Sequence, residues 1–171
     1  MSDAATIAVL DMGKTNVKLS AVTSDGHVLE SATIPNPVLD APPWRHNDLA
    51  AVGHWTLDQL SALCFRYPIA HVIAAGYGSG GVLVGNDPDA PGGGVALPMV
   101  DYEQALPAGV TDDYVPLSGS FFDRGSAIMQ AATHQARQLF WMQRTEPQGF
   151  AAARWYLGLP QYWAWWWSGV A

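Results

Sequence analysis

Residues 7–22, IAVLDMGKTNVKLSAV, constrain the fold more than any other stretch of the sequence. The apolar run IAVL precedes the polar group between Asp11 and Asn16, and apolar residues alternate with polar ones after it, at Val17, Leu19 and Ala21. A short apolar run and a period of two are both typical of β-strands. Walker-type phosphate loops and dinucleotide fingerprints lead directly into a helix, so the second strand excludes both. The polar residues are therefore predicted to lie at the tip of a β-hairpin.

The hairpin tip carries residue types that suit phosphate binding. Gly13 permits a tight or positive-φ turn, and the backbone amides from Lys14 to Asn16 can then point together at an anion. Lys14 and Thr15 would add a charge and a hydroxyl donor, while Asp11 could hold Mg²⁺ directly or through water. The spacing alone fits a solvated β-hairpin equally well, so both interpretations stay open at this point.

Three strands are predicted in a row, at 6–11, 15–22 and 27–33. The second and third are joined by Ser24-Asp25-Gly26, a strong signal for a tight turn. These strands should form an antiparallel meander. A proline-rich loop follows, and Asp48 can then cap a helix whose apolar residues keep helical spacing as far as Tyr67.

The second half of the chain has a weaker pattern. Residues 71–75 (HVIAA) predict a buried, parallel strand that ends in the glycine loop GYGSGG, and PMVDYE could include a short edge strand. Further helices are predicted at 126–144 and at 150–157, and Pro160 interrupts the second of these. Residues 104–125 have little periodicity. No repeat or clear linker divides the chain, which predicts one domain.

The composition and charge of the chain indicate where the protein is found and which classes of partner it does not bind. The chain has 171 residues, 49% of them hydrophobic, and a formal net charge of −7. Its eight basic residues are scattered, so we expect no nucleic-acid partner. The N-terminus does not have the pattern of a signal peptide, no apolar run approaches the ~20 residues of a membrane span, and Cys64 is the only cysteine. We therefore expect a cytoplasmic protein without a membrane partner, in which Cys64 is a small buried side chain.

Four stretches of the sequence together resemble one family. The hairpin motif Asp11-x-Gly13-x-Thr15-Asn16-x-Lys18 resembles the first phosphate loop of the actin, hexokinase and Hsp70 ATPase superfamily. More narrowly, it is similar to the start of an FGGY-family carbohydrate kinase. The stretches HVIAAGYGSGGVLV, LPMVDYE and PQYWAW follow in the order of that family, and the last two are similar to its fuculokinase- and rhamnulokinase-like branch.

The resemblance implies an α/β fold and a chemistry. The fold would be a ribonuclease-H-like mixed sheet with helices, and the reaction would transfer the γ-phosphoryl group of ATP to a hydroxyl of a ketose or deoxyketose, with Mg²⁺. The implied cofactor-binding residues are Asp11, Gly13, Lys14, Thr15 and Asn16, with Asp11 also on the metal. The implied sugar-binding residues are Tyr77, Gly78, Asp101 and Glu103.

The resemblance also implies that residues 1–171 are the incomplete N-terminal lobe of a longer kinase. The catalytic base would lie beyond Ala171, the partner would be the C-terminal lobe, and this chain by itself would be inactive. Two residues depart from the family pattern, because Tyr77 replaces a histidine and Ser79 replaces an alanine, which puts the sugar contact there in doubt. Whether the protein forms a homo-oligomer is left open.

Two alternatives to a kinase lobe remain. One is a noncatalytic remnant that binds a sugar or a phosphate, and the other is an actin- or Hsp70-like ATPase lobe, which shares only the first hairpin. The tryptophans of WAWWW surround most of a helix, which favours a buried core helix over a sugar platform. The histidines have no metal-ligand spacing with one another or with Cys64.

Overall fold

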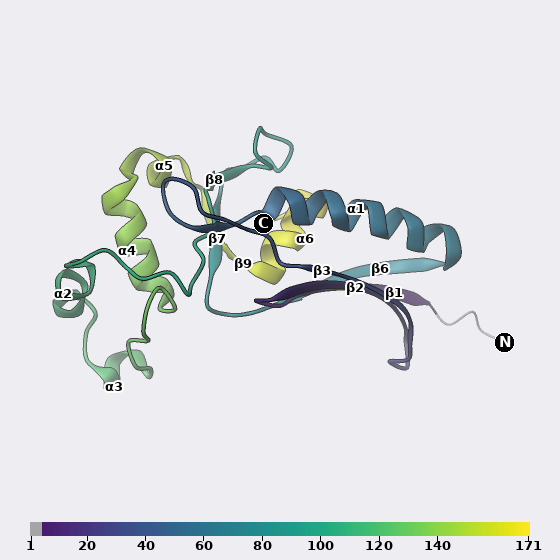
Figure 1. Cartoon of the computed structure of the whole chain (residues 1–171), viewed down its shortest axis with the longest axis horizontal. Coiled ribbons are helices and arrows are strands. Elements are labelled where there is room, and N and C mark those ends of the chain that lie inside the picture. Colours follow the sequence, from purple (N-terminus) through teal and green to yellow (C-terminus); the bar gives the residue numbers. More distant parts are fainter. Residues whose placement is uncertain (1–4) are drawn as a thin grey trace.

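The computed structural model describes residues 5–171. Its strands are β1 (Thr6–Met12), β2 (Asn16–Thr23), β3 (Val28–Pro35), β4 (Val38–Leu39), β5 (His46–Asn47), β6 (Ile69–Gly76), β7 (Gly81–Val84), β8 (Val95–Leu97) and β9 (Trp155–Gly158). Its helices are α1 (Leu49–Arg66), α2 (Val110–Tyr114), α3 (Phe121–Arg124), α4 (Gln135–Thr145), α5 (Pro147–Ala152) and α6 (Leu159–Ser168), with a 3-10 turn, η1, at Val115–Leu117. Figure 1 shows an elongated molecule with the main sheet and α1 at one end and α2 to α5 at the other.

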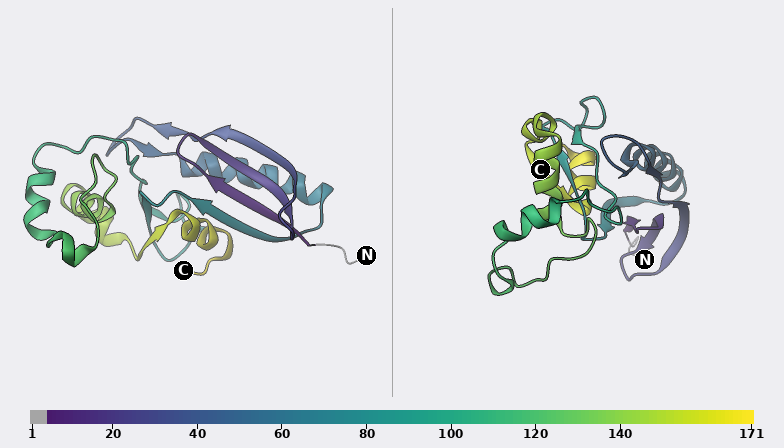
Figure 2. Two further views of the ribbon diagram at one scale, coloured as in Figure 1. Left: turned by 90° about the horizontal axis from the view of Figure 1, so that it is seen from below. Right: turned by 60° about the vertical axis from the view of Figure 1, so that its left-hand side comes forward.

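The main sheet has the strand order β3-β2-β1-β6. β1, β2 and β3 form the predicted antiparallel meander, and β6 pairs with β1 in parallel, also as predicted. α1 packs behind this sheet (Figure 2, left) and begins where Asp48 accepts a hydrogen bond from the Ala51 amide at 2.9 Å. The mixed α/β fold that the family resemblance implies is therefore present.

A core lies between the sheet, α1 and α6. Alternate residues of β1 and β2 enter it, Leu10 and Leu19 among them, and α6 adds Trp163 and Trp165, which are almost fully buried. The tryptophan-rich helix is thus part of the core, as expected. The opposite phase of β1 places Asp11 on the exposed face of the sheet.

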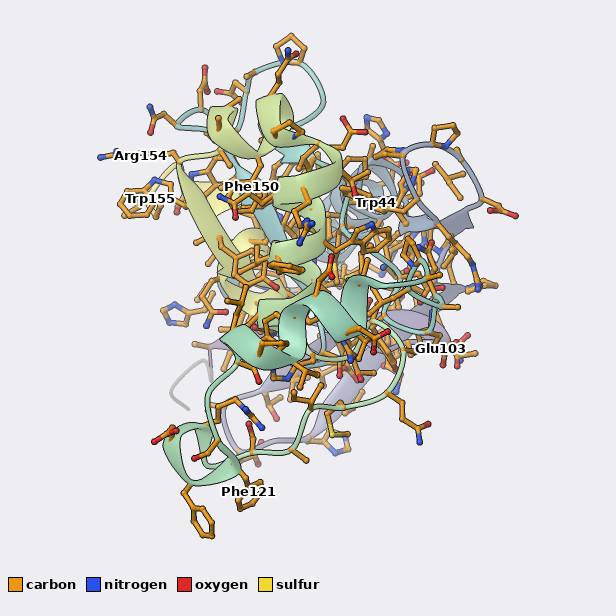
Figure 3. All side chains as sticks on the ribbon, turned by 90° about the vertical axis from the view of Figure 1, so that its left-hand side faces the viewer. Trp44, Glu103, Phe121, Phe150, Arg154 and Trp155 are labelled. Atoms are coloured by element: carbon orange, nitrogen blue, oxygen red, sulfur yellow. The ribbon has the colours of Figure 1, made fainter. Side chains whose placement is uncertain are left out.

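A second, smaller sheet has the order β8-β7-β9 and pairs all of its strands antiparallel. Together with α4 and α5 it surrounds a second core, which includes Trp44 and Trp141. α3 projects from this end of the molecule with Phe121 at its surface (Figure 3). None of the helices formed by residues 5–171 has the length and the apolar composition needed to cross a membrane.

Several expectations for single segments were wrong. The predicted helix 150–157 is divided, because α5 ends at Ala152 and Trp155–Gly158 pairs with β7 as a strand. The predicted helix 126–144 exists only as α4, since residues 126–134 form a loop and turns. Tertiary pairing with β7 outweighs the helical spacing of this region.

Burial was also misjudged at two places. β6 is an edge strand, and most of its side chains are exposed, with Ile73 at 51%. Cys64 is exposed on α1 rather than buried.

The edge strand expected within PMVDYE is absent from the described structure. β8 ends at Leu97, before this segment, and Val100 makes only an isolated bridge to His46.

Candidate functional site

The β1–β2 hairpin tip is a tight turn closed by backbone contacts. The Gly13 amide donates to the Asn16 carbonyl at 2.9 Å, and a Cβ atom on Gly13 would lie 3.0 Å from that same oxygen. Gly13 is not among the glycines with positive φ, so close approach of two backbone segments explains glycine here. Asn36, after β3, holds the tip by donating its side-chain amide to the Gly13 carbonyl at 2.9 Å and its backbone amide to the Thr15 carbonyl at 2.8 Å.

Lys14 extends from this tip to residues that are distant in sequence. Its amine is hydrogen-bonded and ion-paired to Asp101, lies 3.5 Å from the carboxylate of Glu103, and lies 5.3 Å from the centre of the Tyr102 ring. Asp101 is fully buried, whereas Glu103 is at the surface (Figure 3). The structure therefore brings a predicted phosphate-binding residue against two predicted sugar-binding residues.

Asp101 has a second cationic neighbour, Arg45, which sequence reasoning missed. Arg45 Nε lies 3.2 Å from Asp101 Oδ2, and the Asp101 amide donates to the Arg45 carbonyl at 2.9 Å. Oδ2 is buried and makes no hydrogen bond within the described part of the chain, although this cation is close. Arg45 precedes a two-residue strand and has no motif around it, so no sequence signal could have identified it.

Tyr77 joins the same group of residues through its ring and its hydroxyl. The hydroxyl donates to Asn47 Oδ1 at 3.3 Å, and the ring lies edge-on to Tyr102 with the centroids 5.1 Å apart. Burial, followed by the nearby carboxylate of Asp101, raises the pKa of Tyr77 well above that of free tyrosine. The phenol is therefore a neutral hydrogen-bond donor throughout the physiological pH range.

The glycine loop after β6 is held by α4. Gln135 donates to the Gly78 carbonyl at 2.6 Å, and Gln138, which is buried, donates to the Ser79 carbonyl at 2.7 Å. Gly78 itself has open space around it, because a Cβ atom there would meet nothing within 4 Å. The two glutamines were not identified from the sequence, because no motif surrounds them and the carbonyls that they contact lie 57 and 59 positions earlier in the chain.

The remaining predicted residues lie apart from this cluster. Asp11 is exposed near the end of β1, opposite Lys18 in the register with β2, and makes no ion pair with another described residue. Thr15 and Asn16 are exposed at the tip. Asp11 and the tip therefore form one open region, and the residues around Asp101 and Tyr77 form a neighbouring, more buried region that Lys14 connects to it.

The open region has groups that suit a metal-bound phosphate. Within residues 5–171, the amides of Lys14 and Thr15 have no hydrogen-bond acceptor, so both are free for an oxyanion. Asp11 offers one carboxylate, and Mg²⁺ is usually held by one or two carboxylates together with phosphate and water oxygens. No group of three His, Cys, Asp or Glu side chains among the described residues could form a complete metal cage. The donors therefore fit Mg²⁺ bound together with a phosphate.

Replacing Tyr77 with phenylalanine tests the hydrogen bond to Asn47. We expect the free energy of unfolding to fall by about 1–2 kcal/mol, because Asn47 Oδ1 is left buried without its donor. Tyr102→Phe is the matched control, since the Tyr102 hydroxyl makes no hydrogen bond with a described residue, and it should change stability by less than about 0.5 kcal/mol. Urea unfolding followed by tryptophan fluorescence measures both, and equal losses would contradict the assigned role of the Tyr77 hydroxyl.

Solved structures resemble this chain, whereas family models and curated sequences do not. No family model and no curated protein match the sequence. A carbohydrate kinase from Novosphingobium aromaticivorans is similar over 97% of this chain, with 31% identity and a TM-score of 0.85. A xylulose kinase from Rhodospirillum rubrum (18% identity, 94% of this chain, TM-score 0.69) and a gluconate kinase from Lactobacillus acidophilus (13% identity, 95% of this chain, TM-score 0.67) share the fold.

The extent of these matches is as informative as their quality. The chain covers 34%, 34% and 33% of the three solved kinases, respectively, so it spans about a third of their length. The mixed sheet with its helices is one lobe of the actin-like kinase fold. In structure the chain therefore matches the N-terminal third of FGGY carbohydrate kinases, to which it is related.

Proposed function

We propose that this chain forms the first lobe of a carbohydrate kinase, which transfers the γ-phosphoryl group of ATP to a sugar hydroxyl. The observation that carries the proposal is the contact of Lys14 with the buried Asp101 and the exposed Glu103, because it places the hairpin that we assign to phosphate beside the carboxylates that we assign to the sugar. The similarity to solved carbohydrate kinases over nearly the whole chain supports it. The motifs LPMVDYE and PQYWAW favour the fuculokinase- and rhamnulokinase-like branch, and therefore a ketose or deoxyketose as substrate.

The phosphate end of ATP would bind at the hairpin tip. The free amides of Lys14 and Thr15 would donate to phosphate oxygens, the Thr15 hydroxyl and Asn16 would add donors, and Asp11 would hold Mg²⁺. When bound, MgATP supplies the activated phosphoryl group and a metal that neutralises its charge. The Lys14 amine already neutralises Asp101 and Glu103, so its main contribution is to join the phosphate region to the sugar region.

The sugar would bind at the buried region next to the tip. Asp101 Oδ2 is a carboxylate oxygen without a hydrogen bond, which can accept from a sugar hydroxyl, and the neutral Tyr77 phenol can donate to one. Glu103 lies at the open rim, and the space around Gly78 allows a ligand to approach the backbone. These groups recognise hydroxyls, which is the chemistry that a sugar requires.

We assign no catalytic base within residues 1–171 and therefore expect binding without turnover from this chain alone. Asp101 is already paired with two cations, and Asp11 is assigned to the metal, so neither is free to accept a proton from the sugar. Closure of a second lobe around the substrates would also be needed to exclude water. A noncatalytic binding protein would share the binding but would not gain activity when a second lobe is supplied.

Calorimetry with MgATP tests the assignment of the hairpin tip. Asp11→Asn should weaken MgATP binding at least tenfold, about 1.4 kcal/mol, and should leave binding of ATP without Mg²⁺ nearly unchanged. Asp58→Asn, at an exposed position on α1, is the matched control and should bind MgATP as the unmodified chain does. Equal MgATP affinity in Asp11→Asn would overturn the metal assignment.

Coupled ADP release with L-fuculose, L-rhamnulose and L-xylulose tests turnover. We expect none above background for residues 1–171, and we expect activity when a complementary kinase lobe is supplied on the same chain. If this chain alone turns over substrate and Asp11→Asn abolishes that turnover, a catalytic base is present within residues 1–171. That result would contradict our proposal that this chain binds without turnover. Absence of both sugar and MgATP binding would overturn the proposed function altogether.

A further inference from the structure

A cavity of about 510 Å³ lies outside the region assigned to phosphate and sugar. Its walls come from the first turns of α1, the glycine-rich loop between β7 and β8, the segment around Met99, and α6. Small-molecule sites in proteins usually have volumes of about 300–1,000 Å³. The cavity therefore has the size of a ligand site.

The walls are mainly apolar and include two large aromatic rings. Leu49, Val95 and Met99 supply aliphatic surface, and Tyr162 and Trp166 supply the rings. At Gly93, where φ is +66°, a Cβ atom would lie 3.2 Å from Trp166 Nε1, so glycine lets the loop approach the indole closely. Such walls suit a flat, apolar ring better than a polyhydroxylated sugar.

Asn47 is the buried polar residue of the cavity wall. It is only 3% exposed, its Oδ1 accepts from Tyr77, and its Nδ2 has no hydrogen-bond partner among the described residues. An unpaired buried amide is unfavourable, and a ligand atom that accepts its hydrogen bond would remove that cost. Asp48 lines the cavity together with His46 and His54, and no lysine or arginine is among its lining residues. Because the chain also carries a net charge of −7, an anionic ligand is disfavoured.

We propose that this cavity binds a neutral, flat heteroaromatic molecule with a hydrogen-bond acceptor, of the size of a nucleobase or nucleoside. The ring would pack on Trp166 and Tyr162, and the acceptor would pair with the Asn47 amide. Because Asn47 also holds the Tyr77 hydroxyl, this site adjoins the proposed sugar site through one residue. The proposal does not depend on the kinase function, since none of the phosphate-binding residues lines the cavity.

Titration of the ¹⁵N-labelled chain with adenosine, followed by NMR, tests the site directly. We expect saturable shifts at the Trp166 indole N–H and at the amides of Gly92 and Gly93, with no such shifts on addition of ribose. If adenosine causes no shifts at these groups up to its solubility limit, the proposal is overturned. The readout is separate from that of the proposed function, whose ligands should shift resonances around Lys14, Tyr77 and Asp101.

Two variants on α1 test the same site through the affinity for adenosine, without relying on the assignment of NMR shifts. Ala50 is exposed and lines the cavity, so Ala50→Phe should fill part of it and weaken adenosine binding at least tenfold. Ser61→Phe, at an exposed position of the same helix outside the cavity, should change the affinity less than twofold. Equal affinities for the two variants would contradict the assigned cavity. Asp11→Asn should weaken MgATP binding while leaving adenosine binding unchanged.

Discussion

Replacing Asp101 with alanine is expected to lower the free energy of unfolding by about 3 kcal/mol, because it removes one partner from a buried ion pair. The Asp101 side chain is fully buried and is paired with Lys14 on one oxygen and close to Arg45 on the other. It also accepts the Glu103 amide at 3.2 Å, so the substitution removes a backbone contact as well. Urea unfolding at neutral pH measures the loss.

Glu103→Gln is the matched control for that substitution. Glu103 is paired with the same lysine, but its side chain is 56% exposed, and exposed ion pairs contribute about 0–1 kcal/mol. We therefore expect a change of less than about 0.5 kcal/mol for Glu103→Gln. If Asp101→Ala is no more destabilising than Glu103→Gln, the buried carboxylate does not organise the site as described.

Replacing Trp163 with alanine should destabilise the fold by about 3–5 kcal/mol, the usual range for removing a buried large aromatic side chain. Trp163 is fully buried, its indole N–H donates to Met12 Sδ at 3.4 Å, and its ring lies 5.0 Å from that of Tyr162. This residue joins α6 to the middle of the main sheet, so its loss opens a cavity in the principal core.

Phe65→Ala is the control for truncation of an aromatic side chain without a core contact. Phe65 is 93% exposed on α1, and its removal should change stability by less than about 0.5 kcal/mol. Thermal unfolding followed by circular dichroism measures both variants. A loss below about 1 kcal/mol for Trp163→Ala would mean that α6 is not anchored in the core through this residue.

The first half of the fold could be predicted because local signals there agree with tertiary pairing. Alternation in 16–22, the turn at Ser24-Asp25-Gly26 and the cap at Asp48 each specify an element through contacts between near neighbours. The second half could not be predicted equally well. Trp155–Gly158 becomes a strand because β7, whose residues lie 71 to 77 positions earlier than their partners, offers an edge to pair with, and no local pattern records that edge.

The candidate site likewise contains residues that were predicted from the sequence and residues that only the structure revealed. The resemblance predicted site roles for Asp11, Lys14, Tyr77 and Asp101 one by one, but it gave no indication that Lys14 pairs with Asp101 instead of standing free for phosphate. Asn36, Arg45 and Asn47 have no motif, and they became visible only through the hydrogen bonds and the ion pair that they make to the predicted residues.

The sequence by itself determined the hairpin with a polar tip, because the apolar run in 7–10 and the period of two in 16–22 are properties of neighbouring residues. It also determined that the tryptophan-rich helix is part of the core, because apolar residues surround most of that helix. The tertiary structure decided which polar side chains meet. Lys14 reaches Asp101 across 87 residues of chain, and Asn47 lies between Tyr77 and a cavity lined by α6, because burial and pairing act over distance in space and leave no period in the sequence.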